Sequence, residues 1–594
     1  MTRASTTMIK NIPYGIADFK EIQEKRYYYV DKTMYIPQLE AAGKYLFFLR
    51  PRRFGKTLFL NVLESYYDWG WQDAFDTLFT GTYIAEHPTS EKHAYLILKF
   101  NFSQVNPDPE SVETSFQAHI DTQIFFFGKR YRDFLDDDYY EMVAKYARAC
   151  EKLEFLMKYV GSIGKKVYVL IDEYDNFANT ILSMYGQRNY QELTHGTGFL
   201  RFFFNVLKGG TSDTGAGLGR LFITGVSPIT MDDVTSGFNI GRNITLDAPC
   251  NQLLGFTQHD VLQMLRYYRQ AGCRLPASDD AMLALMHEWH DGYRFSKDGA
   301  APLFNTDMVL YFLQQTLDCG KYPDEMIDEN MKIGYGKFRH LVVLGHQLNG
   351  NFQRLSNIVE TEEVQSSVVK HFPVEGLIET ENFISLLFYF GLLSFVEARE
   401  GEACLGIPNR TIKTLLYSYL RDGFKDVDVF RIDLRRFANL IHTMAYNGEW
   451  ESVFQFLARE IEEQSRIRDY LTGEKVIQTF LLAYLNVADY YITHSEEEMG
   501  KGYADLFLEP FWAKYKEMHY AYLIEIKYIK RKEWSETVQT EICSEAATQL
   551  KQYAADTRVL KRIQGATLKC LVLIFSGWEL KVAQEILLQV YGNL

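Results

Sequence analysis

A strand, a loop and a helix in direct succession constrain the fold of this chain more than any other feature. Residues 45–63 read YLFFLRPRRFGKTLFLNVL, where an apolar strand enters a loop that ends in Gly55-Lys56-Thr57 and continues as an amphipathic helix. A loop that feeds a helix N-terminus directs backbone N–H groups at a phosphate, as in a P-loop. Lys56 is expected to reach the β- and γ-phosphate oxygens and the Thr57 hydroxyl to hold Mg²⁺, with Arg53 and Phe54 completing the predicted nucleotide site. The pattern G-x-x-x-x-G-K-[ST] asks for glycine where this chain has Arg50, so the usual turn of the loop is not assured.

A second apolar strand ends in two carboxylates. Residues 166–173 read KVYVLIDE, so Asp172 and Glu173 follow a strand of the buried type. In P-loop ATPases the first acid coordinates Mg²⁺ through water, and the second polarises the attacking water as general base. One predicted strand, residues 94–102, separates this motif from the phosphate loop, as in the P-loop branch that inserts a strand there. The two motifs together predict a site for ATP and Mg²⁺.

A third apolar strand ends in hydroxyl groups. Residues 220–227 read RLFITGVS, and Ser227 is a candidate sensor of the γ-phosphate or of the lytic water. A simple capped strand end is the alternative for this serine. Arg242 and Arg294 are candidates for an arginine finger, although exposed arginines are most often solvated surface groups.

The order of predicted elements divides the chain into three blocks. Residues 1–250 alternate short apolar runs with helical stretches, which predicts an α/β domain with a parallel sheet. Residues 251–449 read mostly helical and predict a lid or linker domain, with a winged-helix-like arrangement as an open alternative. Residues 450–594 read helix, helix, strand, hairpin, strand, helix, strand, helix, a second and smaller α/β unit. The predicted strands of the first block are 45–49, 94–102, 167–171, 221–224 and 244–246; the middle block has amphipathic runs at 261–268 and 383–396 and a hairpin near 403–407.

Acidic residues and a lysine meet on a predicted hairpin near the C-terminus. Residues 502–508 read GYADLFL and residues 521–527 read AYLIEIK, two strands joined by a polar turn. Side chains at i and i+2 share a strand face, so Glu525 and Lys527 point the same way, and Asp505 can meet them across the hairpin. Two carboxylates at this range, Asp505 and Glu525, can bind Mg²⁺, and the lysine can orient or deprotonate the attacking water. The pattern D…ExK is that of a metal-dependent nuclease, while a surface salt-bridge ladder is the alternative.

Three further features favour the nuclease interpretation. Glu474 opens an amphipathic helix that can bring another acid to the hairpin, and Gln549 lies on a helix where its amide can position water or a backbone phosphate. A basic run follows the second strand, with more basic residues beyond it: Lys527, Lys530, Arg531, Lys532, Arg558, Lys561 and Arg562. Against a net charge of −14, from 63 basic and 77 acidic side chains, local basic groups are what a polyanion needs.

Composition limits the class of protein. A net charge of −14 excludes a histone-like polycation, and 47% hydrophobic with 24% charged residues is ordinary for a globular protein. The seven cysteines form no CxxC pair, which fits neither a disulfide framework nor a zinc site. No window approaches the ~18 apolar residues of a membrane span. We therefore expect a cytoplasmic protein with no membrane association.

With both groups of residues in view, the chain resembles the bacterial AAA-ATPase-like proteins that carry a C-terminal PD-(D/E)XK nuclease-superfamily domain. The stretches that carry the resemblance are YGIADF (14–19), YYVDKT (28–33), FLRPRRFGKT (48–57), LIDEYD (170–175), IPN (407–409) and the ADLFL and IEIK strands. Similar sequences also use an R-P-R-R-F-G-K-[ST] loop, so Arg50 resembles a family trait. The resemblance implies phosphate binding by Gly55, Lys56 and Thr57, handling of Mg²⁺ and water by Asp172 and Glu173, and nuclease-core roles for Glu474, Asp505, Glu525, Lys527 and Gln549.

The chain departs from the family pattern at two places. Similar sequences commonly carry G-x-G-R-x-D before the nuclease aspartate, where this chain has Tyr503 in place of the arginine. They commonly show Y-N-P after the helical junction, where this chain has Phe304-Asn305-Thr306. The first departure concerns substrate contacts and the second a turn, and neither touches the predicted metal-binding acids.

Three functions are compatible with the sequence. The first is an ATP-binding and ATP-hydrolysing protein that couples its nucleotide state to a metal-dependent nuclease acting on DNA or RNA, with homo-oligomerisation as a further option. The second is a nucleotide-dependent switch or scaffold whose nuclease-like domain binds nucleic acid or protein without cleaving. The third is an ATPase motor or chaperone with the C-terminal block as a substrate adaptor. The intact set of Glu474, Asp505, Glu525 and Lys527 favours the first.

Overall fold

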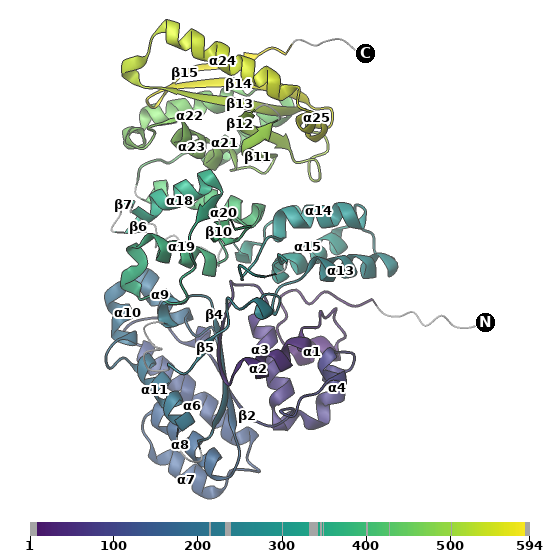
Figure 1. Cartoon of the computed structure of the whole chain (residues 1–594), viewed down its shortest axis with the longest axis vertical. Coiled ribbons are helices and arrows are strands. Elements are labelled where there is room, and N and C mark those ends of the chain that lie inside the picture. Colours follow the sequence, from purple (N-terminus) through teal and green to yellow (C-terminus); the bar gives the residue numbers. More distant parts are fainter. Residues whose placement is uncertain are drawn as a thin grey trace, which may run out of the picture. The chain divides into compact units, whose positions relative to one another are not determined.

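The structure is a computed structural model of the chain, shown in Figure 1. It describes residues 9–212, 216–231, 239–299, 301–331, 343–344, 347–348, 350–398, 402–426, 428–499 and 502–588. The chain forms two compact units, one of residues 1–340 with 363–412 and the other of residues 341–362 with 413–594. The domain boundaries at residues 250 and 449 stay predictions.

A five-stranded parallel sheet forms the centre of the first unit. Its strands are β1 (Tyr45–Leu49), β2 (Leu96–Asn101), β3 (Val167–Asp172), β4 (Leu218–Gly225) and β5 (Arg242–Asn243). The strand order is β2-β3-β4-β1-β5, and every pair is parallel. In this register Asn101 lies opposite Asp172, so the carboxyl ends of β2 and β3 meet at one edge of the sheet. The prediction of an α/β domain with a parallel sheet is confirmed.

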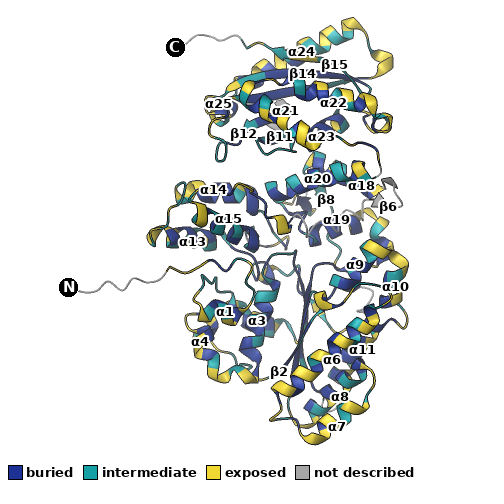
Figure 2. Cartoon of the chain, turned by 180° about the vertical axis from the view of Figure 1, so that it is seen from behind, coloured by how far each residue is buried: buried dark blue, intermediate teal, exposed yellow. Residues whose placement is uncertain are grey.

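Helices cover the sheet and bury their apolar faces against its strands, whose buried residues are dark blue in Figure 2. Helix α3 packs on β2 and β3, α6 packs on β2, and α11 packs on β4. The helices and 3₁₀ turns of this part are α1 (Phe19–Glu24), η1 (Thr33–Tyr35), α2 (Ile36–Ala42), α3 (Lys56–Tyr67), η2 (Trp69–Ala74), α4 (Phe75–Phe79), α5 (Tyr83–Glu86), η3 (Phe102–Gln104), α6 (Val112–Arg130), α7 (Asp137–Lys145), α8 (Ala149–Ser162), α9 (Asn176–Tyr185), α10 (Gln187–Thr194) and α11 (Phe199–Ser212).

The strand predicted at residues 244–246 is wrong in position, because the observed strand β5 comprises Arg242–Asn243 and ends before residue 244. Ile244 N still donates to Phe47 O at 3.0 Å. Beyond it, Leu49 N donates to the Thr245 hydroxyl at 2.9 Å, so a side chain takes the place of the next backbone carbonyl. The backbone hydrogen bonds between β1 and β5 therefore stop where the Thr245 hydroxyl takes the place of a backbone carbonyl.

The rest of the first unit is mostly helical. It contains η4 (Ala248–Cys250), α13 (Gln258–Gln270), α14 (Asp279–His290), α15 (Thr306–Cys319), η6 (Val374–Ile378), α19 (Thr380–Tyr389) and a small antiparallel sheet of β8 (Glu363–Gln365), β10 (Cys404–Gly406) and β9 (Ser394–Phe395) in that order. Asn305 caps α15 by accepting from Met308 N at 3.2 Å, so the helix begins normally although threonine follows the asparagine.

Two predictions in this region need correction. The amphipathic run at 383–396 is helical only as far as Tyr389, because Gly391 adopts a φ of 76° and ends the helix before β9. The hairpin predicted near 403–407 is formed by β9 and β10, so it begins at Ser394, before the predicted stretch, and β8 pairs with the other side of β10.

A mixed five-stranded sheet forms the centre of the second unit. Its strands, in spatial order, are β11 (Tyr491–Met499), β12 (Gly502–Pro510), β13 (Tyr520–Ile529), β14 (Thr567–Ser576) and β15 (Glu579–Ile586). Only β13 and β14 run parallel, and the β12–β13 hairpin pairs antiparallel as predicted. The remaining elements are β6 (Val343–Leu344), β7 (Gln347–Leu348), α18 (Gly350–Thr361), α21 (Leu434–Asn447), α22 (Glu451–Glu463), η7 (Ser465–Asp469), α23 (Glu474–Leu485), η8 (Arg531–Glu533), α24 (Glu536–Ala554) and α25 (Thr557–Ile563), while α20 (Arg410–Asp426) carries the chain from the first unit into the second.

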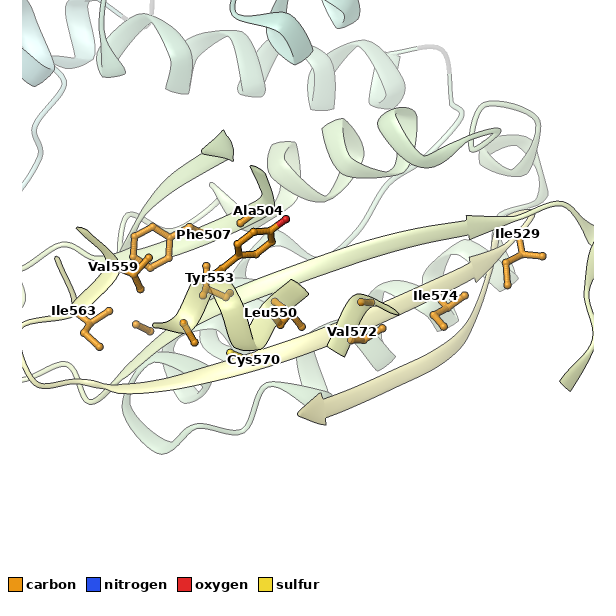
Figure 3. Close-up of a cluster of buried hydrophobic side chains, with 14 residues drawn as sticks. Ala504, Phe507, Ile529, Leu550, Tyr553, Val559, Ile563, Cys570, Val572 and Ile574 are labelled. Carbon is orange, nitrogen blue, oxygen red and sulfur yellow. The ribbon is translucent and has the colours of Figure 1, made fainter. Parts of the chain in front are cut away.

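One face of this sheet is closed by α24 and α25. Leu550 and Tyr553 of α24 and Val559 of α25 pack on Phe507 and Val572 of the sheet in one buried apolar cluster (Figure 3). The helix predicted at the C-terminus is wrong, since residues 579–586 form β15. A two-residue turn at Gly577-Trp578 brings this segment back along β14, whose backbone groups it pairs. Periodicity alone does not reveal such a pairing.

Candidate functional site

The phosphate loop joins β1 to α3. Gly55 caps α3 with a φ of 91°, a left-handed conformation that glycine adopts without strain. Lys56 is 6% exposed, and its ammonium donates to the carbonyls of Arg50 at 3.1 Å and Pro51 at 3.0 Å. Burial lowers the pKa of Lys56, against the opposite influence of Glu173 and Asp172. The lysine is therefore held inside the loop, beside the helix N-terminus that would receive a phosphate.

The two predicted Mg²⁺ ligands of this loop are in contact. The Thr57 hydroxyl donates to Asp172 Oδ2 at 2.7 Å, and Asp172 Oδ1 is buried with no hydrogen-bond partner in the described part of the chain. Burial raises the pKa of Asp172, and the hydrogen bond from Thr57 opposes this effect. An orphaned carboxylate oxygen beside a threonine hydroxyl fits Mg²⁺, which binds through few protein ligands and keeps several waters.

A cavity of about 530 Å³ opens over this loop. Its lining includes the polar or loop residues Arg52, Arg53, Gly55, Lys56, Thr57, Asn101, Asp172, Glu173 and Asn176, and apolar and aromatic residues such as Ile16, Tyr28, Tyr29, Phe256 and Leu310. Glu173 has a φ of 51°, rare for a residue with a side chain, and its Oε2 accepts from Asn176 Nδ2 at 2.8 Å. A cavity lined by both polar and apolar residues has the character that a nucleotide requires.

Arg50, at the position of the missing glycine, is buried. It is 1% exposed, and its guanidinium lies 4.2 Å from the ring centres of both Phe48 and Phe295. It donates to the carbonyls of Leu49 at 2.9 Å, Thr245 at 2.8 Å and Cys250 at 2.9 Å. Arg50 thus ties the start of the loop to residues about 200 positions later in the chain.

Two other predicted residues lie away from the cavity. Phe54 is buried against the rings of Tyr293 and Phe295, with centroids 5.0 and 5.2 Å away. The Ser227 hydroxyl accepts from Ile229 N at 3.3 Å, and Ser227 N donates to Asp175 Oδ2 at 2.6 Å. Neither residue lines the cavity of about 530 Å³. Arg53 does, and it pairs with Asp307 of α15 at 3.5 Å, where burial raises the pKa of that carboxyl to about 6.

The second site lies where β12 and β13 separate. Their pairing ends at Leu506 and Ile524 in this region, while β13 stays paired with β14 as far as Ile529, so only the later N–H groups of β13 that face β12 lack a partner on that strand. Ile526 N donates instead to Asp505 Oδ2 at 2.7 Å, and Tyr528 N donates to Glu474 Oε2 at 3.2 Å. The open edge of β13 therefore fixes two carboxylates, from β12 and from the N-terminus of α23.

Lys527 lies among three carboxylates. Its ammonium is 2.8 Å from Glu525 Oε1, 3.7 Å from Asp505 Oδ2 and 3.9 Å from Glu474 Oε1. Burial lowers the pKa of Lys527, but Asp505 and Glu525 outweigh it and raise the pKa above its usual value. Burial, and then the negative charge of Asp505, raise the pKa of Glu525 to about 7. The Glu525 side chain is 3% exposed, and its Oε2 is buried without a hydrogen-bond partner among the described residues.

Comparison with known proteins agrees with this geometry. Residues 13–235 match the family model described as "Predicted AAA-ATPase", and residues 472–585 match that of the "PD-(D/E)XK nuclease superfamily". The chain joins an AAA-ATPase-like domain to a PD-(D/E)XK nuclease superfamily domain. The resemblance stated from the sequence is thereby confirmed.

One relative is an uncharacterized protein in the vnfD 5′ region of Azotobacter chroococcum mcd 1. It is 28% identical over 308 residues, which is 51% of this chain and 52% of the relative, so the match spans about half the length of that protein. Similar solved structures include Cdc6p of Pyrobaculum aerophilum, with 10% identity and a TM-score of 0.26 over 70% of this chain and 98% of that one. The ORC2 protein of Aeropyrum pernix, in ADPNP–ADP complexes, shows 10% identity and a TM-score of 0.27 over 66% of this chain and 93% of that one. Because these TM-scores are low, we assign the fold of the ATPase-like domain from its strand order and loop geometry.

The nuclease-like domain contains two site residues that sequence patterns missed. Gln478, one turn after Glu474 on α23, is 4% exposed and donates to the backbone carbonyl of Asp505 at 2.7 Å. Tyr553 is 4% exposed on the face of α24 that covers the sheet, and after burial the charges of Glu525 and Asp505 raise its pKa. Gln549 is exposed one turn earlier on the same helix. Each lies one helical turn from a predicted site residue, Glu474 or Gln549, but that spacing alone does not mark a site residue until its burial is known.

The departure from the family pattern at residue 503 has no structural account here, because Gly500 and Lys501 and the side chain of Tyr503 lie outside the described residues. No cluster of three or more His, Cys, Asp or Glu side chains within the described ranges could hold a metal ion by itself. No helix in the part of the chain that the structure describes is long and apolar enough to cross a membrane.

Proposed function

We propose that this protein binds MgATP in the ATPase-like domain, hydrolyses it, and uses its nucleotide state to control metal-dependent cleavage of nucleic acid by the nuclease-like domain. The observation that carries the proposal is the set of charges at the open edge of β13, where Lys527 lies within 3.9 Å of three carboxylates. A strand edge capped by two acids, with a third acid buried beside them, is costly to build for a purely structural purpose. Ionisable side chains whose pKa values are shifted by burial and by neighbouring charges are concentrated at functional sites.

In the ATPase-like domain, each polar group of the cavity has a defined task. Lys56 leaves its two carbonyl partners to contact the β- and γ-phosphates, while Gly55 allows their close approach to the helix N-terminus. Thr57 and Asp172 would hold the metal ion, whose contribution would be to offset charge on the transferring phosphoryl group. Glu173 orients the attacking water as general base, once it is released from Asn176.

In the nuclease-like domain, Asp505 and Glu525 are the metal ligands. A metal held there would supply an activated water and would offset charge on the scissile phosphate. Lys527 would present its ammonium to the phosphate or to the attacking water. Glu474 keeps the edge of β13 in place and supplies an outer carboxylate. Gln549 is exposed on α24, and its proposed role is to contact the substrate.

The test is cleavage of labelled single- and double-stranded DNA and RNA by the full chain, with Mg²⁺ or Mn²⁺ and with or without ATP. Wild type is compared with Lys56→Ala and Glu525→Gln, and with the exposed controls Lys20→Ala and Glu536→Gln. We expect cutting that requires Glu525 and a divalent metal, and that responds to ATP only when Lys56 is present. Both controls should behave as wild type.

Two results would change the conclusion. Cutting that survives Glu525→Gln would place the activity elsewhere or in a contaminant. Nucleotide binding through Lys56 without cutting under any condition would instead support a nucleotide-dependent switch or scaffold. Oligomeric state and location in the cytoplasm stay predictions, and gel filtration with and without ATP addresses the first.

A further inference from the structure

The charge of the nuclease-like site creates a problem for its proposed substrate. Three carboxylates, those of Glu474, Asp505 and Glu525, surround one ammonium. Without metal this group carries excess negative charge and repels a polyanion, and one divalent ion only balances it. A nucleic acid strand therefore needs positive groups beside the site that hold its phosphates.

Such groups lie just beyond the site at the end of β13. The guanidinium of Arg468 in η7 lies 4.3 Å from the ring centre of Trp578, and that of Arg531 in η8 lies 5.1 Å from it. We call Arg468, Arg531 and Trp578 the basic ledge. Six basic residues occur on and around it, interspersed with the acidic Glu462, Glu463, Asp469, Glu533 and Glu579: Arg466, Arg468, Lys530, Arg531, Lys532 and Lys581.

The backbone around Trp578 is shaped to hold this arrangement. Gly577 has a φ of 60°, and its N–H donates to the carbonyl of Ile529 at 3.3 Å, at the end of the sheet where Figure 3 labels Ile529. A Cβ on Gly577 would lie 2.7 Å from Arg531 Nε. Glycine therefore meets two needs at once, the left-handed turn and the passage of the arginine side chain over it.

Both arginines are oriented by fixed partners and keep donors for a ligand. Arg468 donates through Nε to the carbonyl of Ile461 at 3.4 Å and through Nη2 to that of Glu462, at the end of α22. Arg531 Nη2 lies 3.2 Å from Glu579 Oε1, and its side chain is 54% exposed. A guanidinium carries five N–H donors, so each arginine retains several for the oxygens of a phosphate.

The ledge flanks the acidic site through two separate segments. Lys530 and Arg531 follow Lys527 on the same stretch of chain, and Arg468 precedes Glu474 by six residues. Arg531 lies four residues after Lys527, at most about 13 Å of extended chain, which is about four nucleotide steps along one strand of a duplex. The site and the ledge are thus spaced for one continuous polynucleotide.

We infer that the basic ledge binds the phosphate backbone of a nucleic acid strand within a few nucleotides of the bond placed at the acidic site. This inference rests on the proposed function, because it names what anchors the substrate of the same site. A polynucleotide is favoured over other anions because the ledge combines guanidinium groups with an aromatic ring beside a site suited to phosphodiester chemistry.

The test measures binding of short labelled single-stranded DNA, duplex DNA and RNA by fluorescence anisotropy over a range of salt concentrations. The full chain carries Glu525→Gln to prevent cutting, and Ca²⁺ is present. Arg468→Gln and Arg531→Gln should each weaken binding about tenfold and reduce the slope of log affinity against log salt by about 0.7–0.9. Arg531→Lys should keep the slope, and Arg435→Gln, an exposed arginine on α21, should change neither quantity.

Each outcome decides between the inference and its rivals. Unchanged affinity and slope in both glutamine variants, or no binding by the parent, overturns the ledge. Binding to vesicles that contain phosphatidylserine, with no binding to nucleic acid, also overturns it. If wild type cuts nucleic acid and both glutamine variants cut with unchanged KM, the ledge fails while the proposed function stands. If wild type cuts nothing but the salt slopes fall as expected, the nuclease proposal fails and the ledge stands.

Discussion

Restoring the missing glycine of the phosphate loop should damage this protein. Arg50→Gly converts the loop to the general pattern G-x-x-x-x-G-K-[ST], which by sequence alone looks like an improvement. In the structure, however, the Arg50 guanidinium is the hydrogen-bond donor for the carbonyls of Thr245 and Cys250. It also fills the space between the rings of Phe48 and Phe295. A glycine supplies none of these contacts.

The size of the effect follows from these contacts. Two buried carbonyls lose their partner, at about 1–3 kcal/mol each, and the side-chain volume is left empty. The flexible glycine adds about 1 kcal/mol of backbone entropy. Burial lowers the pKa of Arg50 to about 9, which shows that burying this charge is unfavourable. Removing the charge therefore offsets part of the lost stability. We expect a net destabilisation of about 4 kcal/mol, or a fall in melting temperature of about 8–16 °C for the ATPase-like domain.

The assay is thermal unfolding of the full chain together with binding of a fluorescent ATP analogue. Because Lys56 donates to the Arg50 carbonyl, displacement of that carbonyl should also weaken nucleotide binding, by about tenfold. Arg50→Lys, which keeps the charge without the planar fork, should be intermediate. The matched control is Arg26→Gly, an exposed position with a φ of 54° where glycine should be neutral or stabilising. Wild-type melting and affinity in Arg50→Gly would refute the idea that this arginine braces the loop.

Three further predictions concern the nuclease-like domain. The pKa of Glu525 is raised to about 7 from 4.5, so its contribution to stability is complete below about pH 4.5 and is lost as pH rises through 7. In chelator, Glu525→Gln should remove up to about 3 kcal/mol of this pH dependence, measured by calorimetry from pH 5 to 8, and an identical slope in the variant would contradict the assignment. Gln478→Leu should lower the free energy of unfolding by about 1–2 kcal/mol, because Gln478 donates to the backbone carbonyl of Asp505. It should also lower kcat for cleavage more than it changes KM, and an unchanged kcat would contradict this role. Gly577→Ala should lower the free energy of unfolding, measured by chemical denaturation, by about 2 kcal/mol. The control Gly565→Ala, where a Cβ meets nothing within 4 Å, should lower it by about 1 kcal/mol. Equal losses in the two variants would contradict the close contact between Arg531 and the turn.

The parts of the fold that could be predicted from sequence are those with local causes. The strand–loop–helix around Lys56 and the acidic end of β3 follow from periodicity and from residues adjacent in the chain, and the parallel sheet they predicted is confirmed. The hairpin of β12 and β13 is local in the same sense. β15 was mistaken for a helix because its partner β14, and not its own side-chain pattern, decides its conformation.

The candidate sites divide in the same way. Neighbours in sequence, such as Glu525 and Lys527, could be placed on one face by strand geometry alone. The burial of Arg50 could not, because its partners Thr245, Cys250 and Phe295 are brought to it only by the tertiary fold. Gln478 was missed because an amide inside an apolar helix has no signal until the backbone carbonyl it contacts is known.

The two sites use lysine in opposite electrostatic settings, and this difference explains their surroundings. In the ATPase-like domain Lys56 rests on neutral carbonyls, and together with Arg52 and Arg53 it equals in number the three acids of the cavity, Asp172, Glu173 and Asp307, so the metal that accompanies a nucleotide supplies the extra positive charge. In the nuclease-like domain Lys527 is outnumbered by carboxylates, so that site attracts a cation first and a phosphate only afterwards. A nucleotide therefore needs no anchor beyond its own cavity. A polynucleotide at the second site needs both a metal and positive charge outside the acidic group, which is where the basic ledge lies.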